Sequence, residues 1–302
     1  MAKTNKLNPQ YQKLIEQIKI DGENYTNAQM KGVYAQQKSS LTAIHTLVGL
    51  MFIKYATDGL LKLTAPQKTI ITAQFATSFK AIGKELGTKE VTTVTKILGN
   101  VFSETYYKNA YTMQSGISSA VNFNILKQPV IDSAVETEFK GEMFSDRIWN
   151  NKAGMIDMLK NGLTKAMQGN TSIDALGKNI QNTFNVTAYQ SMRLVHTEMA
   201  RVQSQASDTI GQDAGITQQM YTATLDNKTS PECSALSGTI YDINDPDKVV
   251  PPENHPNCRC VLQNMPDNWN PSTRMDNETK EMIPYQTYAD WASDKGIPND
   301  DE

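Results

Sequence analysis

The sequence predicts an α+β protein, with a mostly α-helical N-terminal two-thirds followed by a small C-terminal module that contains a mixed β-sheet. Apolar residues recur at three- and four-residue steps as far as about Ile210, the spacing that places them on one face of a helix. After Gly215 the pattern changes to alternation, which is typical of strands. Beyond Pro266 the chain becomes polar and rich in proline and asparagine, so little regular structure is expected there.

These changes divide the chain into three regions. Residues 1–140 are expected to form a helical bundle region, 141–265 a second domain that ends in the small sheet, and 266–302 a polar acidic tail. The segment 264–302 carries nine acidic and three basic residues, so acidity is concentrated at the C-terminal end. One weak helix, over 287–295, is expected in the tail.

The first region is predicted to contain several antiparallel helices. Pro66 suits the first turn of a helix that Gly83 or Gly87 ends, and a further helix is expected over 89–111. His45 lies on an apolar face, so we expect it to be packed in the core.

Three helices are predicted in the next segment. One runs from about Met143 to Met167, a shorter one over 173–184 is capped by Thr171 or Ser172, and a long one covers 186–213. Apolar residues of the long helix form one core stripe: Val195, Met199, Val202, Ala206 and Ile210.

The polar side of the long helix carries charged residues that could serve a site. Arg193 and Arg201 lie on this side, and Glu198 can pair with Arg201 across three residues. His196, beside Glu198, is expected to have a half-buried packing or hydrogen-bonding role.

The C-terminal module is predicted to combine a short helix with three strands. Ser230 and Pro231 are typical of a helix start, and Gly238 of a helix end, so Cys233 should lie in the first helical turn. Strands are expected over 220–225, 239–243 and 258–265.

All three cysteines and one of three histidines fall within the segment 226–261. The prolines around His255 favour extended or turn backbone, and Cys258 and Cys260 would then share a face with Arg259 opposite. With Cys233 returning from upstream, three thiols and an imidazole could bind one zinc ion in a closed, structural tetrahedral site.

Three alternatives to zinc remain open for this cluster. The cysteines could be reduced and partly buried, acting as small apolar residues. A disulfide is disfavoured by the odd number of cysteines and the absence of a visible secretory signal. A nucleophilic cysteine with a histidine base would be an enzyme site, but no third orienting group is evident.

Composition limits the classes of partner. The net charge is −3 and the pI about 5.7, so no overall basic field indicates nucleic-acid binding. The first eight residues lack the apolar core of a signal peptide, so export is not expected. The apolar segment 41–63 is interrupted by charges and its longest clean run, 47–53, is far shorter than the ~20 residues that cross a bilayer. We read it as a buried helix and expect no membrane contact.

Four motifs point to a family. The sequence contains, in order, R-L-V-H-T-E-M-A-R (193–201), T-L-D-x-x-T-S-x-x-C (224–233), L-S-G (236–238) and P-P-x-N-H-P-N-C-R-C (251–260). Together they resemble the phage minor head protein family, the Mu protein F-like head morphogenesis domain, over about 141–262.

The resemblance implies a component of the virion, at the capsid interior or portal vertex, made in the cytoplasm of the host bacterium. It implies association with the portal protein and capsid proteins of the procapsid, and it leaves contact with packaged phage DNA open. It implies no proven catalytic activity, and no small-molecule substrate is expected.

Three functions therefore compete. The first is a structural protein whose helices dock on a portal or capsid partner. The second is an enzyme, a hydrolase or an ADP-ribosyltransferase-like protein, using Glu198 and Arg193 with Asp226 beside the zinc module; an ion pair holding helix to sheet explains these residues better. The third is nucleic-acid binding through Arg193, Arg201 and Arg259, which lack the interleaved aromatic residues of such sites.

Overall fold

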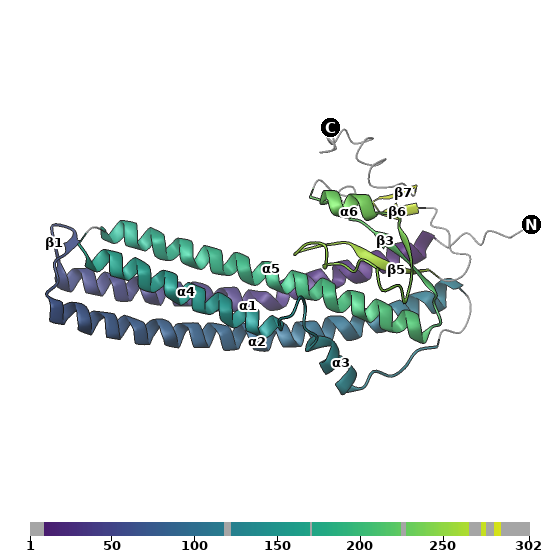
Figure 1. Ribbon diagram of the computed structural model, residues 1–302, viewed down its shortest axis with the longest axis horizontal. Coiled ribbons are helices and arrows are strands. Elements are labelled where there is room, and N and C mark those ends of the chain that lie inside the picture. The colour runs from purple at the N-terminus through teal and green to yellow at the C-terminus, as the bar shows by residue number, and fades with distance from the viewer. Residues whose placement is uncertain are drawn as a thin grey trace, which may run out of the picture. The chain divides into compact units, whose positions relative to one another are not determined.

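The structure is a computed structural model that describes residues 9–117, 122–169, 171–224, 228–265, 273–275 and 281–284. The helices are α1 (Pro9–Tyr55), α2 (Ala65–Ile117), α3 (Gln128–Val135), α4 (Phe144–Met167), α5 (Ile173–Asp213) and α6 (Pro231–Leu236). The strands are β1 (Ala56–Thr57), β2 (Leu60–Leu61), β3 (Gln218–Thr222), β4 (Ile240–Asp242), β5 (Val261–Met265), β6 (Thr273–Met275) and β7 (Met282–Pro284). Helices dominate and small sheets lie near the C-terminus, so the predicted α+β class is confirmed (Figure 1).

The N-terminal helices are fewer and longer than predicted. α2 runs unbroken for 53 residues through Gly83 and Gly87, which were expected to end a helix. A Cβ atom at Gly83 would overlap the Ile156 side chain, and one at Gly87 would overlap the ring of Trp149. These glycines therefore allow α4 to approach α2 closely, and this packing outweighs their low helix propensity.

α4 matches its prediction, but the two helices expected after it are one. The single helix α5 has 41 residues and passes through Asn185 without a break. The predicted cap is present, because the backbone N–H of Ala175 donates to Ser172 Oγ at 3.3 Å. Asparagine is only modestly unfavourable in a helix, so the helix and its buried apolar face continue across Asn185.

The chain forms two compact units, each assembled from separate stretches. Unit 1 comprises 1–26, 97–137 and 196–302, and unit 2 comprises 27–96 and 138–195. Since α1, α2 and α5 contribute residues to both units, the boundaries fall inside these helices.

Unit 2 is a helical bundle with one large apolar core. Its core draws on α1, α2, α4 and α5: Ile44, Val48, Met51, Phe52, Ile71, Phe75, Phe79, Leu86, Met155, Leu159, Leu163, Leu176, Ile180 and Phe184, among others. The short hairpin of β1 and β2 connects α1 to α2 and contributes Leu61 to this core.

A charged pair lies inside unit 2. Lys152 Nζ of α4 is 2.5 Å from Glu90 Oε2 of α2, and the two side chains are 2% and 1% exposed. Ser191 of α5 donates to Glu90 Oε2 at 2.9 Å, and Gln37 of α1 donates to Ser191 Oγ at 3.1 Å. Each of the four main helices therefore supplies one side chain to a buried polar network.

The segment 41–63 is less buried than predicted. Met51 and Phe52 are buried, whereas Leu50 and Ile53 are exposed, at 58% and 83%. His45 is also exposed, and its predicted core position is wrong, because the buried face of α1 carries Ile44 and Val48 instead. Among the described residues no helix is long and apolar enough to span a membrane.

Unit 1 contains the sheet, with strand order β4-β3-β5. Both pairings are antiparallel, with Met220 opposite Ile240 on one side and Gln263 on the other, so the sheet is not mixed as predicted. β6 and β7 form a separate antiparallel pair. The rest of the predicted tail, including the helix over 287–295, lies outside the described residues.

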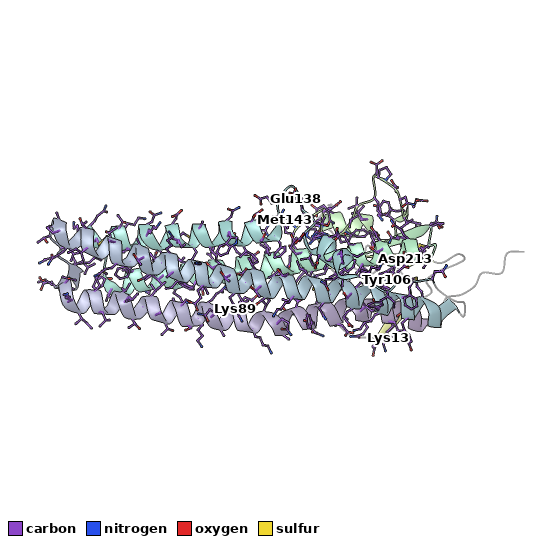
Figure 2. All side chains as sticks on the ribbon, turned by 90° about the horizontal axis from the view of Figure 1, so that it is seen from below. Lys13, Lys89, Tyr106, Glu138, Met143 and Asp213 are labelled. Carbon is purple, nitrogen blue, oxygen red and sulfur yellow. The ribbon has the colours of Figure 1, made fainter. Side chains whose placement is uncertain are left out.

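Within unit 1, α2 is tied to the end of α5 by a hydrogen bond. Tyr106 of α2 and Asp213 of α5 lie side by side (Figure 2), with 2.5 Å between the hydroxyl and Asp213 Oδ2. The backbone N–H of Asn124 donates to the same hydroxyl at 2.7 Å. Burial and this contact with Asp213 raise the pKa of Tyr106 to about 12.

Candidate metal centre

Cys233 is held in place by the start of α6. Ser230 caps the helix as predicted, because its Oγ accepts a hydrogen bond from the Cys233 backbone N–H at 3.2 Å, and Pro231 occupies the first turn. Cys233 then points into an apolar cluster and is only 1% exposed.

His255 lies on a loop that side-chain hydrogen bonds fix to α5. Asn257 has a left-handed backbone with φ of 62°, which asparagine tolerates, and its N–H donates to Thr197 Oγ1 at 2.8 Å. Ser204 Oγ donates to the Pro251 carbonyl at 2.9 Å. His255 Nδ1 lies 3.0 Å from the Pro256 carbonyl oxygen, and when Nδ1 donates this bond Nε2 keeps its lone pair for a metal.

Cys258 and Cys260 alternate with Arg259 as predicted. Both cysteines are buried, whereas Arg259 is partly exposed on the opposite face. Thr224 Oγ1 donates to the Arg259 carbonyl at 2.7 Å, which fixes this extended segment immediately before β5.

Three of the four predicted ligands converge. Cys233 Sγ lies 3.6 Å from Cys258 Sγ and 3.0 Å from His255 Nε2, and the three ligand atoms all lie within 4.8 Å of one another. Sulfurs bound to one tetrahedral zinc at ~2.3 Å would be ~3.8 Å apart, so the observed spacing is compatible with a shared ion. Cys260 belongs to the same buried cluster, but it is not among the three side chains that meet this distance.

No disulfide joins these cysteines. All three are free, and the 3.6 Å between the sulfurs of Cys233 and Cys258 is far longer than the ~2.05 Å of a disulfide bond.

Two further polar side chains hold the sulfur atoms in position. The Tyr221 hydroxyl lies 3.3 Å from Cys233 Sγ and 3.8 Å from Cys258 Sγ. Asn254 Nδ2 donates to Cys233 Sγ and to the Tyr221 hydroxyl, both at 3.1 Å. N–H donors to a thiolate stabilise its negative charge, as in the outer shell of metal sites.

The titratable side chains of the cluster have pKa values shifted in different directions. Hydrogen bonds with Cys258 and Cys260 hold the pKa of Cys233 far below its ordinary value. Burial alone would lower the pKa of His255, but its contacts with the Pro256 carbonyl and with Cys233 raise it. The pKa values of Cys258 and Cys260 are raised, in both cases first by Cys233. Cys233 is therefore the first thiolate of the set, and it faces the His255 imidazole.

This pairing bears on the nucleophile alternative. A thiolate 3.0 Å from an imidazole is the start of a cysteine–histidine catalytic pair. However, the second ring nitrogen of His255 contacts the Pro256 carbonyl, and Cys233 is almost fully buried. The arrangement therefore suits metal binding better than attack on a substrate.

The predicted pair of Glu198 and Arg201 is present. Arg201 Nε lies 2.6 Å from Glu198 Oε2, and both side chains are buried. Arg201 also donates to the carbonyls of Ala134 at 2.8 Å and Val135 at 3.4 Å, at the C-terminal end of α3. The ion pair thus fastens α3 to α5.

Two of the remaining predicted residues fall within the described part of the chain. Arg193 is exposed on the unit 2 part of α5, and Arg259 is partly exposed beside the cysteines. Asp226 lies outside the described residues, so its grouping with Glu198 and Arg193 stays a prediction.

One set of contacts that joins α5 to the sheet was not predicted. Lys248 Nζ lies 3.1 Å from Asp208 Oδ1 of α5 and donates to Gln219 Oε1 of β3 at 2.9 Å. Gln219 Nε2 also donates to Asp208 Oδ1, at 2.8 Å. No local pattern marks Lys248, because its partners are 40 and 29 residues away along the chain.

Residues 157–263 match the sequence family described as Phage Mu protein F like protein. This segment of the chain is similar to the Mu protein F-like family. The Mu F-like segment contains α5, β3, α6 and β4, and it includes all four predicted zinc ligands. The resemblance inferred from the four motifs is thereby confirmed.

A longer alignment links the chain to a bacterial protein. It is 23% identical over 205 residues to "NAD(+)--arginine ADP-ribosyltransferase EFV" of Enterococcus faecalis (strain ATCC 700802 / V583). The alignment covers 63% of this chain and 42% of that protein, so the chain spans less than half of the length of this relative. No solved structure matches the chain significantly.

Proposed function

We propose that this Mu F-like protein is a bacteriophage minor head protein that acts in head morphogenesis. The observation that carries the proposal is the family match over 157–263, which contains the cysteine–histidine cluster and the helix and strands around it. The protein would be made in the cytoplasm of the host bacterium and would become part of the virion, inside the capsid or at the portal vertex.

The partners proposed are the portal protein and the capsid proteins, with packaged phage DNA as a further contact. The long helices are suited to such docking, because α1 presents exposed apolar side chains, among them Leu50 and Ile53. The exposed Arg193 and partly exposed Arg259 are the residues through which DNA contact would be tested.

Particle composition tests this role. Purified DNA-filled particles are expected to contain the protein, detectable by mass spectrometry of its peptides after removal of external protein with protease. A phage in which its codons are replaced by an early stop is expected to yield fewer filled heads in sedimentation. Absence of the peptides from filled, infectious particles would overturn the proposal.

We also propose that Cys233, His255, Cys258 and Cys260 hold one structural zinc ion. The three side chains that already converge have the donor types zinc prefers, and Cys260 lies two residues from Cys258 on the same buried face. When bound, the ion would crosslink α6, the His255 loop and the segment just before β5.

Zinc content and thermal stability test the site. Purified protein is expected to carry one zinc per chain, and zinc at about 100 times its Kd should stabilise the fold by about 2.7 kcal/mol. Cys258→Ser should lose both the metal and this stabilisation, whereas Ser237→Ala, outside the donor set, should lose neither. Metal-free protein that melts at the same temperature with and without zinc would reject the site.

A second candidate function rests on the similarity to the protein named as an NAD(+)–arginine ADP-ribosyltransferase. Under this alternative Glu198 and Arg193 would act in transfer of ADP-ribose from NAD(+) to arginine. The contacts of Glu198 with Arg201 favour the structural role. Incubation with NAD(+) and an arginine analogue is expected to release no nicotinamide; release that Glu198→Gln abolishes in a folded protein would favour the enzyme.

A further inference from the structure

A small cavity is lined in part by Cys260. Its volume is about 20 Å³, enough for one water molecule. Four elements of unit 1 line it: α1 with Lys19, α2 with Asn109, α5 with Gln203, and the β5 segment with Cys260. It therefore brings a lysine from near the N-terminus to a cysteine from near the end of the Mu F-like segment.

Lys19 is unusual because its charged end is buried without a partner. Among the described residues no hydrogen-bond acceptor is in reach of its Nζ, although the atom is shielded from solvent. Both polar side-chain atoms of Gln203 are buried and unpartnered in the same cavity, and the side chain is 6% exposed. A buried ammonium without an anion is unfavourable, so a negative charge is expected nearby.

Cys260 lines the same cavity as Lys19 and can supply such a charge as a thiolate. A neighbouring ammonium favours the thiolate form of a cysteine.

The net charge of the proposed zinc centre indicates the role of Lys19. Zinc with two thiolates and a neutral imidazole is electrically neutral, and such a centre has no need of a cation beside it. With three thiolates the same centre carries one net negative charge in a buried place. The unpartnered ammonium in the cavity that Cys260 lines is a cation of the kind that such a negatively charged centre requires.

We propose that Lys19 of α1 is the counter-ion of a three-cysteine, one-histidine zinc centre and that it stabilises Cys260 as the fourth ligand. Lys19 acts on Cys260 across the cavity, with one water molecule, held also by Gln203, able to bridge the two. This inference rests on the proposed zinc site and adds to it a positioning residue more than 200 positions away in the sequence. It also makes metal binding a tie between α1 and the sheet of unit 1.

A double-mutant cycle tests the assignment. The probe is zinc, with affinity measured by competition against a chromogenic chelator for wild type, Lys19→Met, Cys260→Ser and the double variant. Lys19→Met is expected to weaken zinc binding about tenfold, the lower range for outer-shell residues. In the Cys260→Ser background the same change should have little effect, because the centre is then neutral. Lys13→Met, on an exposed position of α1 (Figure 2), is the matched control and should bind zinc like wild type.

Two further readouts keep the outcome interpretable. Alkylation with and without chelator should show three metal-protected cysteines in wild type and in Lys19→Met, and two in Cys260→Ser. Metal-free Lys19→Met should melt no lower than metal-free wild type, since it loses an unpaired buried charge; Lys19→Gln serves as the second variant if Lys19→Met does not fold. Equal weakening by Lys19→Met in both backgrounds, or no weakening at all, would overturn the role of Lys19 while leaving the zinc site intact. Wild type that binds no zinc would overturn both proposals.

Discussion

Arg201 joins two helices of unit 1 through its guanidinium group. It pairs with the buried Glu198 on its own helix and donates to the last carbonyls of α3, which have no partners within that helix. A cation at this end also opposes the negative end of the helix dipole. The carboxylate that a catalytic hypothesis requires is therefore already committed to a structural contact.

Removing one member of the Glu198–Arg201 pair should lower the stability of the fold more than removing both members. Arg201→Met is expected to lower the free energy of unfolding by about 3–5 kcal/mol, because Glu198 would be left as an unpaired buried charge. The double variant Glu198→Leu, Arg201→Met should lose clearly less. Urea denaturation followed by circular dichroism measures both.

Arg193→Met is the control for this pair. Arg193 is exposed on the same helix, so its replacement should change stability by no more than about 0.5 kcal/mol. If Arg201→Met and the double variant lose the same free energy of unfolding, the structural role of the Glu198–Arg201 pair is contradicted.

The ligand residues show what local sequence can and cannot predict. The cap at Ser230 and the alternation at Cys258 and Cys260 depend on neighbouring residues, and both were predictable. Lys19 and Lys248 were not, because each meets its partners only after distant segments have packed together. The convergence of Cys233 with His255 was a hypothesis from residue type, and packing was needed to bring the atoms to 3.0 Å.

At the scale of elements, glycine within a helix has two different effects in this chain. Gly87 of α2 faces the ring of Trp149 of α4 so closely that no side chain fits between them. Gly154 of α4 is exposed and has open space around it. The amino-acid sequence does not distinguish these two cases. Gly87 was therefore predicted as a possible helix end, although it marks a position of close helix packing.

Alanine at these two positions should change stability in opposite directions. Gly87→Ala is expected to lower the free energy of unfolding by about 1–3 kcal/mol through overpacking. Gly154→Ala should raise it, by up to about 1 kcal/mol, because alanine favours the helix and meets nothing. Thermal melting of the two variants beside wild type measures the difference, and stabilisation of both would show that α4 does not pack on α2 at Gly87.

At the scale of the whole molecule, the proposed metal centre belongs to one unit alone. Its predicted ligands and Lys19 all lie in unit 1, while the core of unit 2 is built from other side chains. Loss of the ion should therefore loosen one unit selectively.

Hydrogen exchange after metal removal measures that selectivity. A chelator is expected to speed amide exchange in 218–265, the part that holds the sheet and the ligand loop, and to leave the unit 2 part of α2, 65–96, unchanged. Cys258→Ser should show the same pattern without chelator. A uniform increase over the whole chain would contradict an ion confined in effect to unit 1.

The class of fold was predictable, whereas the arrangement into units was not. Periodicity reports which face of a segment is buried, so it identified helices early and strands late in the chain. Each unit, however, combines stretches that are far apart in the sequence, with boundaries inside α1, α2 and α5. Periodicity continues unchanged across such boundaries, and it therefore carries no sign of them.

The buried pair of Lys152 and Glu90 restricts how the helices of unit 2 can slide past one another. Apolar side chains of similar size would accept a shift of one helical turn, about 5.4 Å, with modest loss. The same shift would separate the Lys152 ammonium from the Glu90 carboxylate and leave both charges buried without a partner. The four long helices are thereby held at one axial position relative to one another, although their apolar faces alone would allow several.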